Sequence, residues 1–215
     1  MIPDWTEERR KIVETQLRRR GIRDERVLAA MLAIPRERFV PYEERVMAYS
    51  DAPVSIGFGQ TISQPYMTAL MAEALELTGA ETVLEIGAGS GYAAAVLSLL
   101  AERVVTLEVI PALVAYAREN LKAAGFSRNI MVVRGDGSLG YAPLAPYDAI
   151  TVAAAAPEVP PALLEQLKDP GRLVIPVGDS TGQELRVITK RDGRITTRVP
   201  TLCRFVPLRA GGGVQ

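Results

Sequence analysis

From residue 82 onward, short apolar runs of strand length alternate with segments whose apolar positions recur at helical spacing. Strands that alternate with helices in this way are typical of βαβ units, which form a parallel sheet with helices on both faces. The sequence therefore predicts an α/β fold with a doubly wound, mostly parallel, Rossmann-like sheet. The expected strands are Thr82–Ile86, Arg103–Leu107, Ile130–Arg134, Asp148–Val152 and Arg172–Val177, and the expected helices are Tyr92–Leu100, Pro111–Ala124 and Pro160–Leu167.

The residues before this core predict an extension of helices and loops. Thr6–Arg20 has the charge pattern of an amphipathic helix, and a second short helix follows Asp24. Periodicity then fades over Pro41–Pro65, which predicts a long ordered loop, and loops of this length are usually functional. A further helix is expected over Pro65–Leu77, because proline suits the first turn of a helix.

The residues after the core predict an antiparallel hairpin. Leu185–Thr189 and Ile195–Val199 flank Asp192-Gly193, a dipeptide that suits a tight primed turn. A last strand is expected over Cys203–Leu208, followed by a frayed tail at Ala210–Gln215. We expect a single domain over residues 1–215, with helices and loop at 1–78, the core at 79–178, and the hairpin and last strand at 179–215.

Composition and charge exclude several kinds of site. Lysine and arginine together number 25, as do aspartate and glutamate, and this balance argues mildly against a nucleic-acid partner. The chain has no histidine, and Cys203 is its one cysteine, so zinc sites, Ser-His-Asp hydrolysis and intramolecular disulfides are excluded. We expect no metal. No apolar stretch reaches the roughly 20 residues of a membrane span, and the N-terminus has no signal-peptide pattern. We therefore expect a cytoplasmic protein without a membrane partner, and we also expect a monomer.

Glycines and carboxylates stand where the expected strands end. The first strand runs into the sequence LEIGAGSGY, where Gly87, Gly89 and Gly91 would let the backbone approach a ligand closely. The second strand ends at Glu108, about 20 residues further on, where a carboxylate suits the hydroxyls of a ribose. These features have structural alternatives: a tight strand–helix turn for the glycines, and an exposed strand-end carboxylate for Glu108.

The third strand ends in Gly135-Asp136-Gly137, where Asp136 could accept a hydrogen bond from an adenine amino group or simply form an Asp-Gly turn. A dinucleotide oxidoreductase is the competing interpretation of this nucleoside site. Its glycine pattern differs, because the third glycine here comes one residue early. An acidic Glu85 would also repel a pyrophosphate but suits a cation. S-Adenosylmethionine carries an ammonium and a sulfonium, so the sequence predicts it as the cofactor.

Four segments carry a more specific pattern: IGFGQTISQP at 56–65, VLEIGAGSGY at 83–92, AAAPEVP at 154–160 and RFVPL at 204–208. Together they closely resemble the protein-L-isoaspartate O-methyltransferase family of class I methyltransferases, and the resemblance extends from Gly21 to Leu208. Departures are few. Phe58 stands where many bacterial relatives have His or Gln, Ala153 where Thr is common, and Asp169-Pro170-Gly171 in place of a Pro-Gly-Gly turn.

The resemblance implies that a methyl group is transferred from S-adenosylmethionine to the α-carboxylate of L-isoaspartyl residues in damaged proteins and peptides, leaving S-adenosylhomocysteine. The ester would then close to a succinimide that partly hydrolyses to aspartate. The resemblance also implies Ser63 as the active-site hydroxyl, with Thr61 and the backbone near Val206 in contact with the substrate. The expected cofactor contacts are Glu85, Gly87, Gly89, Gly91, Glu108, Asp136 and Gly137.

This chemistry does not require histidine, because a carboxylate with an ordinary pKa of about 4 is already ionised at neutral pH. The catalytic task is then positioning rather than proton removal. On this interpretation Ser63 donates a hydrogen bond that orients the carboxylate, although a serine here could instead cap the helix that follows. Two other functions stay open: a class I methyltransferase with another acceptor, and a catalytically silent domain that binds the cofactor or isoaspartyl proteins.

Overall fold

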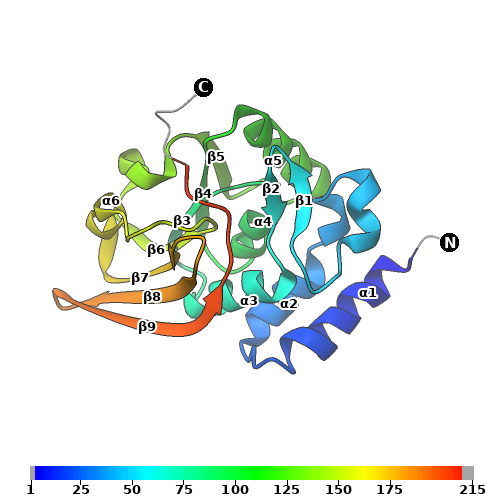
Figure 1. Ribbon diagram of the computed structural model, residues 1–215, viewed down its shortest axis with the longest axis horizontal. Coiled ribbons are helices and arrows are strands. Elements are labelled where there is room, and N and C mark those ends of the chain that lie inside the picture. Colours follow the sequence, from blue (N-terminus) through cyan, green and yellow to red (C-terminus); the bar gives the residue numbers. More distant parts are fainter. Residues whose placement is uncertain (1–2, 210–215) are drawn as a thin grey trace.

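The computed structural model describes residues 3–209, which surround a seven-stranded sheet of order β5-β4-β3-β6-β7-β8-β9 (Figure 1). The first five strands of that order run parallel, and β8 and β9 are antiparallel additions at one edge. The strands are β3 Thr82–Ile86, β4 Arg103–Glu108, β5 Ile130–Arg134, β6 Tyr147–Val152, β7 Leu167–Gly178, β8 Gln183–Arg191 and β9 Arg194–Cys203. The predicted doubly wound, mostly parallel sheet is therefore confirmed.

The helices follow the predicted alternation, although several are shorter than expected. They are α1 Trp5–Ile12, α2 Glu25–Ala33, α3 Pro65–Ala74, α4 Tyr92–Ser98, α5 Pro111–Ala124 and α6 Pro161–Glu165. Local signals in the sequence explain their ends. Asp24 caps α2, since its Oδ1 accepts hydrogen bonds from two backbone N–H groups of the first turn. Pro111 opens α5, and Gly125 closes it in the left-handed conformation.

Two hydrophobic layers cover the sheet, one on each face. Successive residues of a strand point to opposite faces, so Val83 packs with the helices α2 to α5, whereas Leu84 packs on the side of α6. The same alternation holds for Val104 and Val105 of the neighbouring strand. The N-terminal helices belong to the first of these layers, which joins the extension and the sheet in one continuous core.

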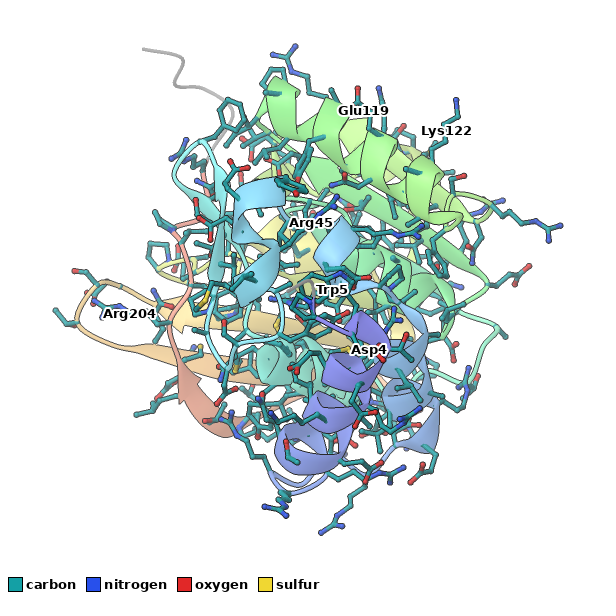
Figure 2. The ribbon with its side chains drawn as sticks, turned by 90° about the vertical axis from the view of Figure 1, so that its right-hand side faces the viewer. Asp4, Trp5, Arg45, Glu119, Lys122 and Arg204 are labelled. Carbon is teal, nitrogen blue, oxygen red and sulfur yellow. The ribbon has the colours of Figure 1, made fainter. Side chains whose placement is uncertain are left out.

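The N-terminal extension differs from its prediction in two places. The helix expected over Thr6–Arg20 begins as α1 and continues as a π-helical turn over Val13–Leu17. Asp4 caps α1, and the ring of Trp5 lies 6.2 Å from that of Tyr49, so this helix packs against the segment around Tyr49 (Figure 2 labels Asp4 and Trp5).

The stretch from 41 to 65, expected to be a loop throughout, contains a two-stranded antiparallel sheet. Its strands are β1 Val54–Gly57 and β2 Gln60–Ile62, and 3-10 turns occupy Arg36–Arg38 and Tyr42–Met47. Strands of four and three residues are too short for a periodicity of two to be recognised in the sequence. The prediction of a loop was therefore wrong over β1 and β2.

The C-terminal hairpin is confirmed and is longer than predicted. Asp192 and Gly193 both have positive φ, 53° and 71°, as a primed two-residue turn requires. Asp169, within β7, accepts hydrogen bonds from both of their N–H groups. In Figure 1 this hairpin extends on the opposite side of the molecule from α1.

The last predicted strand was wrong. β9 ends at Cys203, and residues 204–208 form an extended segment with one bridge, from Pro207 to Ala155. Proline has no N–H to donate to a longer ladder. The tail predicted at Ala210–Gln215 lies outside the described residues. Within residues 3–209, no helix is both long and apolar enough to span a membrane.

Candidate active site

An open cavity of about 780 Å³ lies at the carboxyl ends of the parallel strands. The order of the sheet reverses there, because the chain proceeds from β3 outward to β5 and then returns to β6 on the other side of β3. Such a switch point is where open α/β sheets bind ligands. Of the predicted cofactor residues, Gly87, Gly89, Glu108 and Gly137 line the cavity.

The glycine-rich loop forms one wall because it is bound to the neighbouring strand. The N–H groups of Gly87 and Ala88 both donate to the carbonyl of Leu107, at 2.8 and 3.0 Å. These bonds hold the loop against the end of β4. A Cβ at Gly89 would lie 3.3 Å from Cδ1 of Ile56, so the loop also passes close to β1. The loop is thus fixed between the end of β4 in the large sheet and strand β1 of the two-stranded sheet.

Glu108, the last residue of β4, presents a largely buried carboxylate, 6% exposed, at the cavity. Its Oε2 accepts a hydrogen bond from the N–H of Gly89 at 2.9 Å, and its Oε1 accepts one from Ile110 at 3.0 Å. A carboxylate can accept about four hydrogen bonds. Each oxygen therefore has a lone pair left to accept a hydrogen bond from a hydroxyl, and these acceptors fit the ribose of a nucleoside cofactor.

Glu85 lies behind this wall, facing a second, smaller cavity of about 370 Å³. The two cavities share Ser63 and Ala153, among others. Glu85 is 1% exposed, and its carboxyl accepts a hydrogen bond from the Thr106 hydroxyl. Burial, opposed by the hydrogen bond from Thr106 and assisted by the charge of Glu108, raises the pKa of Glu85 to about 8. Without a cationic neighbour the Glu85 carboxyl is therefore largely protonated at neutral pH.

Gly91 and Asp136 also stand outside the cavity wall. Gly91 precedes α4 with φ of 88°, and a Cβ there would lie 3.0 Å from Cγ of Leu121, so packing and backbone conformation account for this glycine. Oδ1 of Asp136 accepts hydrogen bonds from the N–H and the hydroxyl of Ser138, which caps the 3-10 turn Gly137–Leu139. Sequence spacing predicted both residues as cofactor contacts. It could not distinguish residues that line the cavity from residues that hold its wall in place.

A larger open cavity of about 940 Å³ adjoins the first one. Four residues line both: Thr61, Ser63, Ala153 and Val206. Three of these are the residues that the family resemblance had assigned to the substrate. The structure thus brings Thr61, Ser63 and Val206 together at the junction of the two cavities.

Ser63 is half-buried between β2 and α3. The alternative role for this serine was to cap α3. The N-cap of α3 is instead Gln64, and no side chain makes a capping hydrogen bond there. The Ser63 hydroxyl therefore does not serve to cap α3.

Comparison with known proteins agrees with this geometry. The family model for protein-L-isoaspartate(D-aspartate) O-methyltransferase matches residues 7–212. The chain belongs to this family. A protein-L-isoaspartate O-methyltransferase of Methanoculleus marisnigri is 55% identical over 210 residues, covering 97% of this chain and 94% of the relative. One of Hyperthermus butylicus is 49% identical over 217 residues, covering 95% and 90%.

Solved structures of the family share the fold. A protein-L-isoaspartate O-methyltransferase superposes with a TM-score of 0.82 at 30% identity, covering 95% of this chain and 67% of the other. A Plasmodium falciparum protein assigned to the same activity superposes with a TM-score of 0.80 at 28% identity, covering 97% and 99%, and that structure contains S-adenosyl-L-homocysteine. The family predicted from the four sequence segments is therefore confirmed.

In this family member, two buried polar side chains hold the segments that line the larger cavity at the junction, and sequence reasoning missed both. The amide of Gln183 brackets Phe205: its Nε2 donates to the Phe205 carbonyl at 3.1 Å, and its Oε1 accepts from the Phe205 N–H at 2.6 Å. This fixes the segment that carries Val206; Arg204, labelled in Figure 2, marks where the segment leaves β9.

The second is Arg36, whose guanidinium donates to the carbonyls of Ala48 and Ser63. A single arginine or glutamine that acts through distant backbone groups leaves no spacing pattern in a sequence. Neither residue was therefore open to prediction from one chain.

Proposed function

We propose that the junction at Ser63 is where a methyl group passes from S-adenosylmethionine, bound in the first cavity, to an isoaspartyl carboxylate in the adjoining one. By family, the chain is an S-adenosylmethionine-dependent protein-L-isoaspartate O-methyltransferase that repairs damaged proteins and peptides. One observation supports the placement above all others. Thr61, Ser63 and Val206 line both cavities, so a ligand in each would meet beside them.

The reaction needs an acceptor held in place rather than a base. Bound S-adenosylmethionine supplies a methyl group activated by its positive sulfur. The isoaspartyl carboxylate, with an ordinary pKa of about 4, is already ionised. It must lie roughly 3 Å from the methyl carbon and in line with the bond to sulfur. The Ser63 hydroxyl donates the hydrogen bond that orients it, while Thr61 and the backbone at Val206 hold the rest of the acceptor.

Further reactions of the methyl ester then repair the isoaspartyl residue. The next backbone nitrogen attacks the ester carbonyl and expels methanol, which gives a succinimide. Hydrolysis of the succinimide returns part of the material to an ordinary aspartyl bond. These later steps need no group from the protein, so the site has only to bind, orient and release.

On the cofactor side, the loop at Gly87 and Gly89 would lie against the cofactor, and Glu108 would accept hydrogen bonds from its ribose hydroxyls; Gly137 forms part of the cavity wall. Gly137 is constrained by packing, since a Cβ there would lie 2.1 Å from Cγ2 of Ile86.

Glu85, Gly91 and Asp136 were predicted as direct contacts, and we now propose that they support the site from behind its wall. The domain limits, the absence of a nucleic-acid or membrane partner, the cytoplasmic location and the monomeric state stay predictions from the sequence.

The test is methyl transfer from labelled S-adenosylmethionine to two peptides that differ only in carrying isoaspartyl or aspartyl at one position. We expect a base-labile methyl ester on the isoaspartyl peptide alone. Equal labelling of both peptides would point to a different acceptor. No labelling of either, while S-adenosylhomocysteine binds, would indicate a silent binding domain.

A further inference from the structure

Arg36 is a buried arginine outside the walls of the cavities described above. It stands in the 3-10 turn Arg36–Arg38, and the residue is 1% exposed. Its Nε donates to the carbonyl of Ala48 at 2.6 Å, and its Nη2 donates to the carbonyl of Ser63 at 2.7 Å. The guanidinium carbon also lies over the ring of Tyr92, 4.8 Å from its centroid. One planar group thus touches three separate parts of the chain.

The surroundings of Arg36 do not compensate its charge fully. Nη1 has no hydrogen-bond partner within residues 3–209, and the ion pairs found in that part of the chain do not include Arg36. Burial lowers the pKa of Arg36, and the neighbouring Tyr92 and Tyr49 oppose that shift. A buried charge without an ionic partner lowers the stability of a fold. Stability alone therefore does not account for an arginine here.

The two carbonyls bracket the segment that builds the substrate side of the junction. Between residues 48 and 63 lie β1, β2 and Thr61, and the residues from Gln60 to Ser63 line the first cavity. Arg36 holds both ends of this segment with a rigid fork. The third contact, Tyr92, is the first residue of α4, directly after the glycine loop, and lines the same cavity. The guanidinium therefore connects both ends of the segment 48–63 to Tyr92, at the start of α4 beside the glycine loop.

We propose that Arg36 is a positioning residue, which sets the backbone of Ser63 relative to α4 so that the serine hydroxyl meets the acceptor carboxylate in line with the methyl group. The proposal rests on the proposed function of Ser63. A displacement of about 1 Å at a reacting centre can slow a reaction roughly 100-fold. Arg36 would exert its effect through the 2.7 Å bond to the Ser63 carbonyl.

The experiment compares the wild type with Arg36→Lys and Arg36→Met on the isoaspartyl peptide. We expect kcat to fall about 100-fold in both, because lysine keeps the charge but cannot hold two carbonyls in a fixed geometry. The Kd for S-adenosylhomocysteine should stay within about twofold, since Arg36 lines no part of the cofactor cavity. A kcat within about twofold of the wild type in a folded Arg36→Lys would overturn the proposal.

A double-mutant cycle with Ser63→Ala tests whether Arg36 acts through the serine. If it does, Arg36→Lys should slow the Ser63→Ala enzyme only slightly, because the group that it positions is already absent. Fully additive losses would show instead a general structural role. If the wild type fails to methylate the isoaspartyl peptide, the proposed function fails first, which separates the two failures.

Arg26 provides a matched control. It also donates to two backbone carbonyls, those of Leu77 at 2.5 Å and Leu100 at 3.2 Å, but it lines neither of the two large cavities at the junction. We expect Arg26→Met to lower Tm while kcat stays within about twofold. A loss of kcat in Arg26→Met equal to that in Arg36→Met would assign both arginines to stability alone.

Discussion

The two sides of the cavity junction are built in different ways. On the cofactor side, the loops after the parallel strands form the wall, and backbone hydrogen bonds such as those from Gly87 and Ala88 to Leu107 fix them. On the proposed substrate side, two side chains, Arg36 and Gln183, are the chief contacts that fix the two-stranded sheet β1–β2 and the segment 204–208. Backbone hydrogen bonds at the ends of the parallel strands therefore stabilise the cofactor side, whereas isolated side-chain hydrogen bonds stabilise the other side.

This difference predicts how each side responds to change. Many backbone hydrogen bonds hold the parallel strands in place. One substitution on the cofactor side should therefore alter cofactor binding without moving the sheet. The substrate side has few contacts of its own, with β1 and β2 pairing over three positions and residues 204–208 making one bridge. Elements with few contacts open more easily. Substitutions there should change turnover more than cofactor affinity.

The largest expected effect is at Ser63. Ser63→Ala removes the hydroxyl that is proposed to orient the acceptor, so kcat should fall about 100-fold, while the Kd for S-adenosylhomocysteine should stay unchanged. Radiolabel transfer and calorimetry would measure the two quantities. Ser55→Ala is the control, because Ser55 lies exposed on β1 of the same hairpin and lines neither large cavity. Full activity in Ser63→Ala would remove Ser63 from the catalytic site.

The opposite response is expected at Glu108. Glu108→Gln removes the negative charge of the group proposed to accept hydrogen bonds from the ribose hydroxyls, and hydrogen bonds to charged groups contribute about 1.5–3 kcal/mol. The Kd for S-adenosylhomocysteine should therefore rise about 10- to 100-fold, with little change in KM for the peptide. Glu102→Gln, an exposed carboxylate just before the other end of β4, should leave the Kd unaltered. A Glu108→Gln enzyme with wild-type affinity would mean that the ribose lies elsewhere.

The same contrast explains what could be predicted from the sequence. The cofactor side follows from local patterns: β3 has the predicted bounds Thr82–Ile86, and Glu108 ends β4 as expected. On the substrate side, Thr61, Ser63 and Val206 came only from the family resemblance. The strands β1 and β2 were missed because they are short, and Arg36 and Gln183 because their partners lie 12 or more residues away in the chain.

Gly91 offers a smaller effect that separates support from contact. Gly91→Ala introduces a Cβ at 3.0 Å from Cγ of Leu121, at φ of 88°. We expect a loss of about 1–3 kcal/mol in stability from overpacking and backbone strain. The affinity for S-adenosylhomocysteine should be unchanged. Gly125→Ala has a similar φ of 85° and nothing within 4 Å of its Cβ, so it should lose only the conformational part. Equal losses would show that packing against Leu121 does not matter.

The last expected effect is a change in how stability depends on pH, caused by Glu85. Its carboxyl has a pKa near 8 in the folded protein, raised by burial from the ordinary 4.5. Between these values the folded protein keeps a proton that the unfolded chain releases. The stability that protonated Glu85 contributes is therefore complete below about pH 4.5 and is lost as the pH rises through about 8.

Glu85→Gln cannot ionise, and its amide oxygen can still accept the hydrogen bond from Thr106. The Tm of this variant relative to the wild type should therefore increase steadily from pH 4.5 to 8 and then level off. Thermal unfolding of both proteins across this range, without cofactor, measures the difference. A constant difference in Tm would mean that burial does not raise the pKa of Glu85. Repeating the scan with S-adenosylmethionine tests whether Glu85 acts in the site, because a nearby ligand cation would favour the ionised carboxylate and end the rise at a lower pH.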